Sequence, residues 1–599
     1  MTFHATLLRQ WYIVLLATLL MILTSLIHLL SPPAFDVTSL DKKSYPIEAT
    51  ILARFPGARI QKPSVPWWIG RWLRPSWSQW MGVPTVCDDQ PLPFPILRRI
   101  VADSVSLKDV DSAFDTGMVI KKPFLLLPAK KLAVGQPMCV RAIVPPSPPS
   151  QQVKNSPYRY LYAPFEKQDA ELSEPWWDTM VVSADHQESG ASIPLQMRPW
   201  SGHRLLRWGR RSKLDDDNVP EWSRRLEESM FERGLWHIYE TDVALLDEGQ
   251  YRIEGRLEYA EGRWNFEKGP VLPYDAQRLA VYPHDTLDVV AMTKNRHYDT
   301  AELPLCTRAD HLGRWVPADK GMGKQDKQGK VWAPYECQYR PIQYDAFNRC
   351  LARKYPRGID IYGDSNTRRS LKKFVTQGRW CSSEDDMDNN RRACFCEDFN
   401  ETSWDRTLFD TSARINNLTF VNLPTLGEPS PRSQGVHVRS YKWDGLTYLN
   451  EPEWQQAVRS AAVDVVIISL GNWDTAYMTM DEFSAALMEL VGLIHQQYLK
   501  PYSHKPPRIV YRTPQYYCCR VDHSDRHRRT SGARIQAFDR LARGVFVERF
   551  NAIVWDTLIL GEARTWEEKI ERRKCPANHA TADVVEIENQ LLMNALCNE

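Results

Sequence analysis

The stretch "GIDIYGDSNTRRSLKKF", from Gly358 to Phe374, predicts a buried strand that leads directly into a helix. Its first half is an apolar run, and its second half has the apolar spacing of an amphipathic helix. Gly363, Asp364 and Ser365 lie where the strand turns into the helix. Serine is a favoured residue at a helix N-cap. The sequence therefore leaves two interpretations of Ser365 open, a helix cap and a nucleophile.

From this stretch to the C-terminus, apolar strands alternate with amphipathic helices. The sequence predicts strands over residues 359–363, 418–423, 463–470, 508–512 and 552–556. It predicts helices over residues 367–376, 480–499, 533–549 and 583–596. Continuous apolar strands between such helices are typical of a parallel sheet that is covered on both faces. The expected fold class of this region is therefore α/β.

The carboxyl ends of the predicted strands carry polar side chains, and an open parallel sheet places its active site at this edge. The residues at these ends are Asp364 and Ser365, residues 471–474, residues 512–514 and Asp556. We therefore expect chemically competent groups to converge on one edge of the sheet.

A serine at the start of a helix lies beside unpaired backbone N–H groups and the positive end of the helix dipole. A negative oxygen formed on an attacked ester carbonyl is stabilised at such a place. Asn472 offers a side-chain amide donor to the same oxygen, and a serine nucleophile also needs a base. Among the 14 histidines, His579 is the best candidate, because it precedes the last predicted helix. The alternative interpretations are a turn residue for Asn472 and an ordinary loop histidine for His579.

The motif "YGDSNTRRSL" resembles block I of the SGNH (GDSL-like) hydrolases, in the variant found in the PC-esterase superfamily. That superfamily includes plant trichome-birefringence-like polysaccharide O-acetyltransferases, fungal capsule O-acetylation proteins and the NXPE (neurexophilin and PC-esterase domain) proteins. Upstream, "GRW", "WAPYECQYRP" and "RCLARK" resemble the cysteine-rich lead-in of the family. Downstream, "SLGNWDT" and "VYRTPQYY" stand in the places of its later blocks. The resemblance covers the chain from about Cys306 to Cys597.

The resemblance implies that Ser365 is the nucleophile and His579 the base. It implies an oxyanion hole formed by Asn472 and the backbone amide of Ser365. Gly363 and Asp364 complete the Gly-Asp-Ser motif beside the nucleophile.

Two further residues of the motif need separate treatment. Arg368, at the Gly-Asp-Ser-x-x-Arg position, looks like a structural or substrate-positioning arginine. The family has an acid three residues before its histidine, whereas this chain has Pro576 there. We expect Asp556, at the end of a predicted strand, to be the orienting acid, with Asp583 as the second choice. Absence of such an acid would favour a Ser–His dyad or a loss of activity.

The region from residue 83 to residue 290 is predicted to be a β-sandwich. The runs "PFLLLPAK", "QPMCVRAIVPP", "TMVVSAD" and "GQYRIEGRLEYA" are short and rich in β-forming residues, and turn residues separate them. The order of this region and the SGNH-like domain, residues 300–599, resembles the NXPE arrangement. That arrangement implies an immunoglobulin- or filamin-like domain ahead of the esterase-like domain.

The N-terminus is expected to anchor the chain in a membrane. Residues 11–30, "WYIVLLATLLMILTSLIHLL", have the length and composition of a transmembrane helix. Residues 1–10 would form a cytosolic tail, and residues 31–82 a stem with a tryptophan-rich segment. Positive charges flank the span almost evenly. All 12 cysteines and two glycan-acceptor sequons, at Asn400 and Asn417, follow it. We therefore expect a type II protein of the secretory pathway, in the Golgi, with disulfides in a lumenal body.

The composition bears on partners and cofactors. The net charge is +2 and no long basic stripe is present, so a nucleic-acid partner is not expected. His523 and His527 have helical spacing, but the flanking arginines disfavour a cation, and we expect no metal and no resident cofactor. The 22 tryptophans suit core packing and, for a minority, stacking on sugar rings.

These features predict a membrane-anchored acyltransferase that O-acetylates a glycan or polysaccharide through a serine acyl-enzyme. The acyl donor would be acetyl-CoA or an acetylated carrier. A glycan acetyl-esterase is the first alternative, because the same groups would transfer the acyl group to water. A non-catalytic glycan-binding or adhesion protein that keeps the fold is the second alternative, and a secreted neurexophilin-like ligand is the third.

Overall fold

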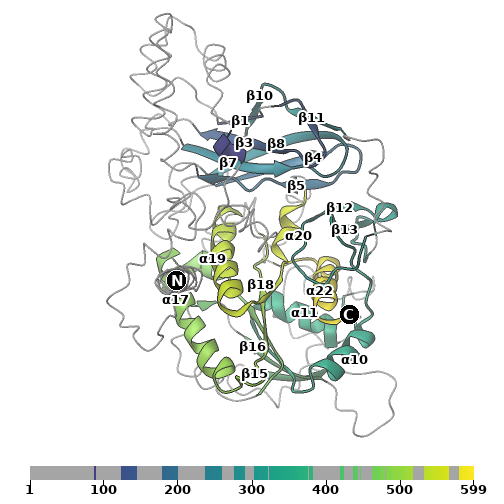
Figure 1. Ribbon diagram of the computed structural model, residues 1–599, viewed down its shortest axis with the longest axis vertical. Coiled ribbons are helices and arrows are strands. Elements are labelled where there is room, and N and C mark those ends of the chain that lie inside the picture. Colours follow the sequence, from purple (N-terminus) through teal and green to yellow (C-terminus); the bar gives the residue numbers. More distant parts are fainter. Residues whose placement is uncertain are drawn as a thin grey trace, which may run out of the picture. The chain divides into compact units, whose positions relative to one another are not determined.

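Figure 1 shows a computed structural model of the chain. The chain divides into two compact units, Met1–Pro46 and Ile47–Glu599. The structure describes residues 86–89, 123–127, 129–144, 179–199, 237–259, 276–290, 303–321, 323–375, 377–378, 380–381, 418–423, 436–442, 445–446, 462–478, 480–516, 532–565 and 579–598. All of these residues belong to the second unit. The predicted tail, membrane span and stem, residues 1–82, lie outside the described residues, as do Asn400 and Asn417.

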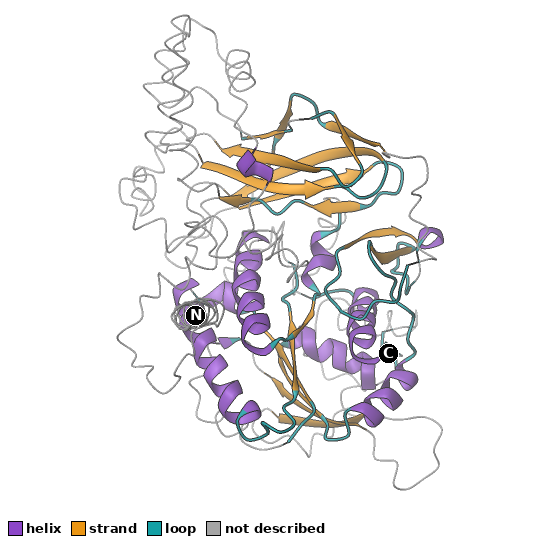
Figure 2. Ribbon diagram, in the orientation of Figure 1, coloured by secondary structure: helices purple, strands orange, loops and turns teal. Residues whose placement is uncertain are grey.

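Two mostly antiparallel sheets form the N-terminal part of the described unit (Figure 2). The first sheet has the order β10-β1-β3-β7-β6 and contains β1 (Phe124–Leu126), β3 (Pro137–Val144), β6 (Arg198–Pro199), β7 (His237–Ala244) and β10 (Ala280–Tyr282). The second has the order β2-β11-β8-β4-β5, with β9 paired to β8, and contains β2 (Lys131–Ala133), β4 (Thr179–His186), β5 (Ser192–Pro194), β8 (Gly249–Tyr259), β9 (Gln277–Arg278) and β11 (Thr286–Val290).

The two sheets pack against each other through apolar side chains. A Cβ added to Gly255 of β8 would lie only 2.9 Å from Leu125 of β1, in the other sheet. The short helix α4 (Val86–Asp89) is joined to β3 by the disulfide Cys87–Cys139. The all-β character predicted for residues 83–290 is thus confirmed, apart from α4, for the described part of that region.

A six-stranded sheet with helices on both faces forms the C-terminal part. Its order is β15-β16-β14-β17-β18-β19, and its strands are β14 (Ile359–Gly363), β15 (Leu418–Leu423), β16 (Val436–Lys442), β17 (Val465–Ser469), β18 (Arg508–Arg512) and β19 (Ile553–Trp555). The main helices are α10 (Tyr344–Lys354), α11 (Ser365–Val375), α17 (Met480–Ile494), α19 (Gly532–Phe550) and α22 (Ala582–Cys597). Shorter elements are η7 (Ala318–Lys320), α16 (Asp474–Tyr477), the π-helical turn η10 (His495–Leu499), α20 (Leu558–Glu562) and the hairpin β12 (Gly313–Pro317) with β13 (Lys330–Pro334).

Alternation along the central strand explains why both faces of this sheet are covered. Val466 and Ile468 of β17 belong to a hydrophobic cluster with residues of α17 and α19. Val465 and Ile467 belong to a separate cluster with residues of α10, α11 and α22. Figure 1 shows the two groups of helices on opposite sides of the sheet. The molecule is therefore a mixed α/β protein with several sheets, one of them largely parallel.

One strand of the large sheet was not predicted, and another runs against the expected direction. β16 lies between β14 and β15, and β15 pairs with it antiparallel, so the sheet is not wholly parallel. The sequence of β16 contains Arg439, which is uncommon inside a sheet. Its guanidinium forms a bidentate ion pair with Asp360 of the neighbouring β14. The ion pair neutralises the charge of Arg439 within the sheet. In the sequence alone that charge interrupts the apolar run, so the strand is not recognised.

The β-rich region and the α/β region belong to the same compact unit rather than to two separate ones. One hydrophobic cluster contains residues of both regions. Arg314 of β12 also forms an ion pair with Asp247, which lies between β7 and β8. Within the described ranges, no helix is long and apolar enough to cross a membrane.

Candidate active site

The junction of β14 and α11 shows which residue caps the helix. The Asp364 carboxylate accepts the backbone N–H groups of Asn366 at 3.0 Å and Thr367 at 3.4 Å. These are the bonds that an N-cap side chain makes with the first turn of a helix. Ser365 is the first residue of α11. Asp364 is therefore the helix cap, and the Ser365 hydroxyl does not have this role.

The Ser365 hydroxyl instead meets the predicted histidine. Its Oγ lies 2.6 Å from His579 Nε2, although the two residues are 214 positions apart in the sequence. His579 comes shortly before α22, and Ser365 comes at the start of α11, so the contact joins two helix N-termini. A hydroxyl within hydrogen-bond distance of an imidazole has the geometry needed for proton transfer from the nucleophile.

Gly363 is required because the chain turns tightly from β14 into α11. A Cβ at this position would lie 2.3 Å from Thr367 Oγ1 on the first turn of the helix. A real Cβ does not lie this close to another atom, so Thr367 or the turn would have to shift. The glycine therefore lets the helix begin immediately beside the strand end, which places Ser365 at the edge of the sheet.

Asn472 lies on the loop after β17 and contacts the same junction. Its Nδ2 donates to the Asp364 carboxylate, and its Oδ1 accepts the backbone N–H of Gln515 at 2.8 Å. A side-chain amide carries two N–H groups, and the bond to Asp364 uses one of them. The structure thus brings Asn472 to the Asp364–Ser365 turn, as expected for residues that follow strands of one sheet.

A buried carboxylate shapes the loop that carries Asn472. Asp474 accepts the N–H groups of Leu446 at 2.6 Å and Gly471 at 2.8 Å. Burial raises the pKa of Asp474 to about 6; the nearby charge of Asp364 acts in the same direction, and the two N–H bonds oppose it. Sequence reasoning did not single out Asp474, although its position two residues after Asn472 was visible.

An ion pair connects the end of β18 with the helix that follows His579. Arg512 and Glu588 of α22 are both fully buried, and Arg512 Nη2 donates to the Glu588 carboxylate at 2.9 Å. Gln515 donates its side-chain N–H to the other oxygen of Glu588. Burial raises the pKa of Glu588, while Arg512 and Gln515 oppose that shift. An acid on the apolar face of the predicted C-terminal helix is the sequence signal that could have revealed this pair.

The two neighbouring arginines of α11 differ in exposure. Arg368, chosen from the motif, is half-buried, and its backbone N–H donates to the Asp364 carbonyl at 3.1 Å. Arg369 is fully buried and donates to the carbonyl of Ala580 at 2.9 Å. Its guanidinium also lies 4.9 Å from the centre of the Trp380 ring. Because Ala580 follows His579, Arg369 ties the helix that bears Ser365 to the segment that bears His579.

The acids chosen to orient His579 are bonded to other groups. Asp556 pairs with Arg543 at 2.7 Å and accepts the backbone N–H of Ile559 at 3.2 Å. Asp583 accepts the backbone N–H of Lys327 at 2.9 Å. Asp556 also directly follows β19, which is third in order from β14, roughly 14 Å away at about 4.8 Å per strand. The predicted strand was one residue too long at this end, and Asp556 is an ion-pair partner of Arg543 in this structure.

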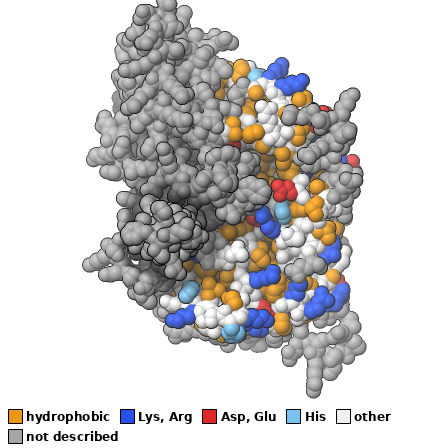
Figure 3. Space-filling view, viewed as in Figure 1, with side chains coloured by type: hydrophobic (Ala, Val, Ile, Leu, Met, Phe, Trp, Pro, Cys, Tyr) orange, Lys and Arg blue, Asp and Glu red, His pale blue; other side chains and the backbone are white. Residues whose placement is uncertain are grey.

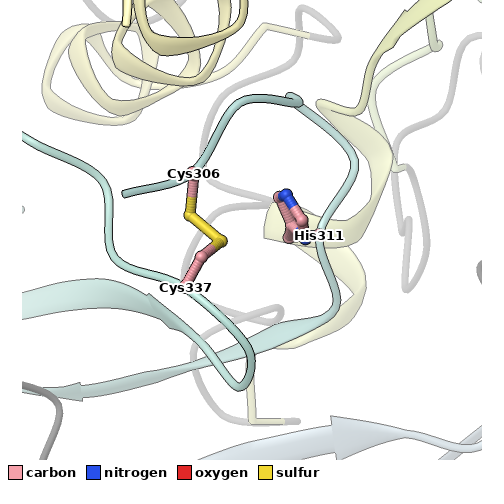
Figure 4. Close-up of side chains that lie close together, drawn as sticks. All are labelled: Cys306, His311 and Cys337. Atoms are coloured by element: carbon pink, nitrogen blue, oxygen red, sulfur yellow. A yellow bond between two sulfur atoms is a disulfide. The ribbon is translucent and has the colours of Figure 1, made fainter. Parts of the chain in front are cut away.

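Two groups of potential metal ligands contain disulfides. Cys306, His311 and Cys337 lie close together, and Figure 4 shows the sulfur–sulfur bond between the two cysteines. The second group, Cys87, Cys139 and Glu240, contains the disulfide of α4 and β3. A disulfide sulfur is not a thiolate and does not serve as a zinc ligand. His523 and His527 lie outside the described residues.

A third disulfide holds the C-terminal helix of the candidate site. Cys350 of α10 is bonded to Cys597 at the end of α22, across 247 positions of sequence. These disulfides, Cys87–Cys139, Cys306–Cys337 and Cys350–Cys597, agree with the expectation from the cysteine pattern. On the described part of the face in Figure 3, basic and acidic side chains are interspersed among apolar ones.

Comparisons of the chain with protein-family models, curated proteins and solved structures gave no match. The interpretation of the site therefore depends on its own geometry. That geometry consists of a hydroxyl beside an imidazole, at a helix N-terminus, with an amide donor at the adjoining turn.

Proposed function

We propose that the chain is a serine-dependent acyltransferase that transfers an acetyl group to a hydroxyl of a glycan. The observation that carries the proposal is the 2.6 Å contact between Ser365 Oγ and His579 Nε2. The start of α11 and the side chain of Asn472 supply N–H groups beside the hydroxyl, where an oxyanion would form. The choice of acetyl as the acyl group and of a glycan as the acceptor rests on the resemblance of the Gly-Asp-Ser segment to PC-esterase proteins.

In the first half of the reaction, Ser365 Oγ attacks the carbonyl carbon of the acyl donor, and its proton passes to His579 Nε2. The tetrahedral oxyanion accepts N–H bonds from the Ser365 backbone and Asn472. The bond to the leaving group then breaks, His579 returns the proton to that group, and an acyl-serine remains. The donor is an activated acetyl compound such as acetyl-CoA or an acetylated carrier.

In the second half, a sugar hydroxyl gives its proton to His579 and attacks the acyl-serine carbonyl. Collapse of the second oxyanion releases the acetylated glycan, and His579 returns the proton to Ser365 Oγ. Water in place of the sugar would make the same site an acetyl-esterase. The buried surroundings of Ser365, which is 6 % exposed, favour transfer because they limit access of water.

The wider architecture of the proposal follows the same resemblance. The α/β region would be an SGNH-like domain, and the two sheets before it an immunoglobulin- or filamin-like sandwich. Residues 11–30 would anchor the chain as a type II protein with a lumenal body in the Golgi. Asn400 and Asn417 would carry glycans there.

The test is hydrolysis of a small activated acetyl ester by the full-length chain, together with labelling by a fluorophosphonate probe. We expect labelling at Ser365 and loss of both signals in Ser365→Ala. In His579→Ala, hydrolysis should fall by at least about a hundredfold, since general-base catalysis contributes that much or more. Arg508→Ala, which changes a residue at the opposite end of β18, serves as the control. A parent chain that neither hydrolyses the ester nor reacts with the probe would rule the proposal out.

A non-catalytic glycan-binding protein is the second candidate. The contacts of Asp556 with Arg543 and of Asp583 with the Lys327 backbone favour it, because each acid chosen to orient His579 has another partner. Under this alternative, the same assay would show no labelling of Ser365.

A further inference from the structure

The loop after β17 buries its polar side chains and leaves its two largest rings accessible. From residue 471 to residue 478, all residues are buried except Trp473 and Tyr477. Tyr477 is 39 % exposed, and it is one of two large hydrophobic residues exposed within the described ranges, the other being Leu305. Asp474, between the two rings, is 0 % exposed. Charged side chains are usually exposed and large aromatic rings are usually buried. This loop does the opposite, which points to a function.

The two rings form one aromatic surface. Their planes are inclined by only 10°, and their centroids are 5.8 Å apart, which is a stacked and offset arrangement. The offset leaves ring area that the partner does not cover. The result is a flat, partly solvated aromatic face.

Buried hydrogen bonds hold the backbone that carries these two rings. Arg534 is 1 % exposed and donates to the carbonyls of Thr475 at 3.0 Å and Met478 at 2.9 Å. The Thr475 hydroxyl donates to the carbonyl of Asn472 at 3.1 Å. Because these bonds fix the backbone, a ligand would not have to order the loop when it binds.

The aromatic surface adjoins the candidate active site. Trp473 directly follows Asn472, and the Asn472 side chain donates to Asp364, the residue before Ser365. We propose that Trp473 and Tyr477 bind a pyranose ring of the acceptor glycan and present its hydroxyl to the acyl-serine. A sugar ring has an apolar face of C–H groups that packs on an aromatic ring, while its equatorial hydroxyls stay in water. This inference rests on the proposed function, because it assigns the acceptor side of the same site.

Saturation-transfer difference NMR tests the binding without any chemistry. The full-length chain carrying Ser365→Ala is mixed with cellotetraose, xylotetraose or chitotetraose, and its aromatic protons are saturated. We expect transfer to the C–H protons of at least one tetrasaccharide. Adding Tyr477→Ala should weaken the affinity about tenfold, a loss of roughly 1.4 kcal/mol. Adding Tyr477→Phe should preserve it, because the ring remains, and Leu305→Ala should leave it unchanged.

Equal affinity with and without Tyr477→Ala would overturn the inference, and so would absence of transfer to all three sugars. Fluorophosphonate labelling of Ser365 in the parent chain reports on the proposed function separately. If Ser365 is not labelled but sugar binding depends on Tyr477, the proposed acyl transfer is rejected and the aromatic surface remains a glycan-binding site. If Ser365 is labelled but sugar binding does not depend on Tyr477, the proposed acyl transfer stands and the aromatic surface is not its acceptor site.

Discussion

Arg369 lies one helical turn after Ser365 on α11, and its guanidinium donates to the carbonyl of Ala580, next to His579. A charged hydrogen bond of this kind contributes about 1.5–3 kcal/mol. Here it joins the segments that carry the two reacting groups. We infer that Arg369 is a positioning residue that keeps the imidazole within reach of the hydroxyl.

Arg369→Lys should therefore lower kcat for the small acetyl ester roughly ten- to a hundredfold, the equivalent of that bond. KM should change little, since Arg369 has no contact with substrate in the proposed reaction. Lys372→Met is the matched control, because Lys372 lies 5.7 Å from the same Trp380 ring. Steady-state kinetics and thermal unfolding of both variants decide the question. An equal loss of kcat in the two variants would show that packing around Trp380, and not the bond to Ala580, is responsible.

The junction of strand β14 and helix α11 sets the position of the nucleophile at the scale of elements. A Cβ on Gly363 would meet Thr367, whose buried Oγ1 has no hydrogen-bond partner among the described residues. The strand and the first helical turn are thus packed as closely as a glycine permits. Asp364 caps the helix at the same point, so adjacent residues supply the close packing, the cap and the hydroxyl.

Gly363→Ala should destabilise the fold by on the order of 2 kcal/mol, as overpacking of a tight site does. Thr367→Ala removes the nearest clashing atom and no hydrogen bond within the described structure. The double variant should accordingly recover part of the stability that Gly363→Ala loses. Urea unfolding of the two single variants and the double variant measures this coupling. Additive losses would mean that the strain lies elsewhere in the turn.

At the scale of the whole molecule, buried carboxyl groups connect distant segments. Glu562 of α20 accepts side-chain N–H bonds from Gln196 at 2.6 Å and from Gln536 of α19 at 2.8 Å. Gln196 lies between β5 and β6, so the carboxyl group joins the β-rich region to the α/β region. Burial raises the pKa of Glu562 to about 7, and the two N–H bonds oppose the shift.

This raised pKa predicts the direction of the pH dependence of stability. Between the ordinary pKa of a glutamate and about 7, the folded state holds a proton at Glu562 that the unfolded state has lost. Stability contributed by this group is present at low pH and is lost as pH rises through the folded pKa, by on the order of 3 kcal/mol at most. Asp474, whose pKa is raised to about 6, acts in the same direction.

We expect the thermal unfolding midpoint of the parent chain to fall more steeply between pH 5 and pH 8 than that of Glu562→Gln. Comparison of the two chains cancels the contribution of other titrating groups. Parallel pH profiles for the parent and the variant would contradict the assignment of this pH dependence to Glu562.

Much of the secondary structure near the site was readable from local patterns. The boundaries of β14, β15 and β18 agree with the predictions, and the ends of α11, α19 and α22 differ by only one or two residues. These elements are long, apolar or strongly periodic, so nearby residues determine them. β16 was missed because the charge of Arg439 is paired across the sheet with Asp360, and a single strand cannot reveal its partner.

The sequence by itself determined that a serine stands where a buried strand meets a helix, and that polar residues follow the neighbouring strands. Burial and turn preferences depend on residues close together in the chain, so they can be recognised as short sequence patterns. Only the tertiary structure decided that Asp364 caps the helix, that Ser365 meets His579, that Arg369 holds the neighbour of that histidine, and that Asp556 pairs with Arg543. Each of these contacts selects one partner among many of the same chemistry. That selection depends on how strands and helices far apart in the chain pack, which no local pattern encodes.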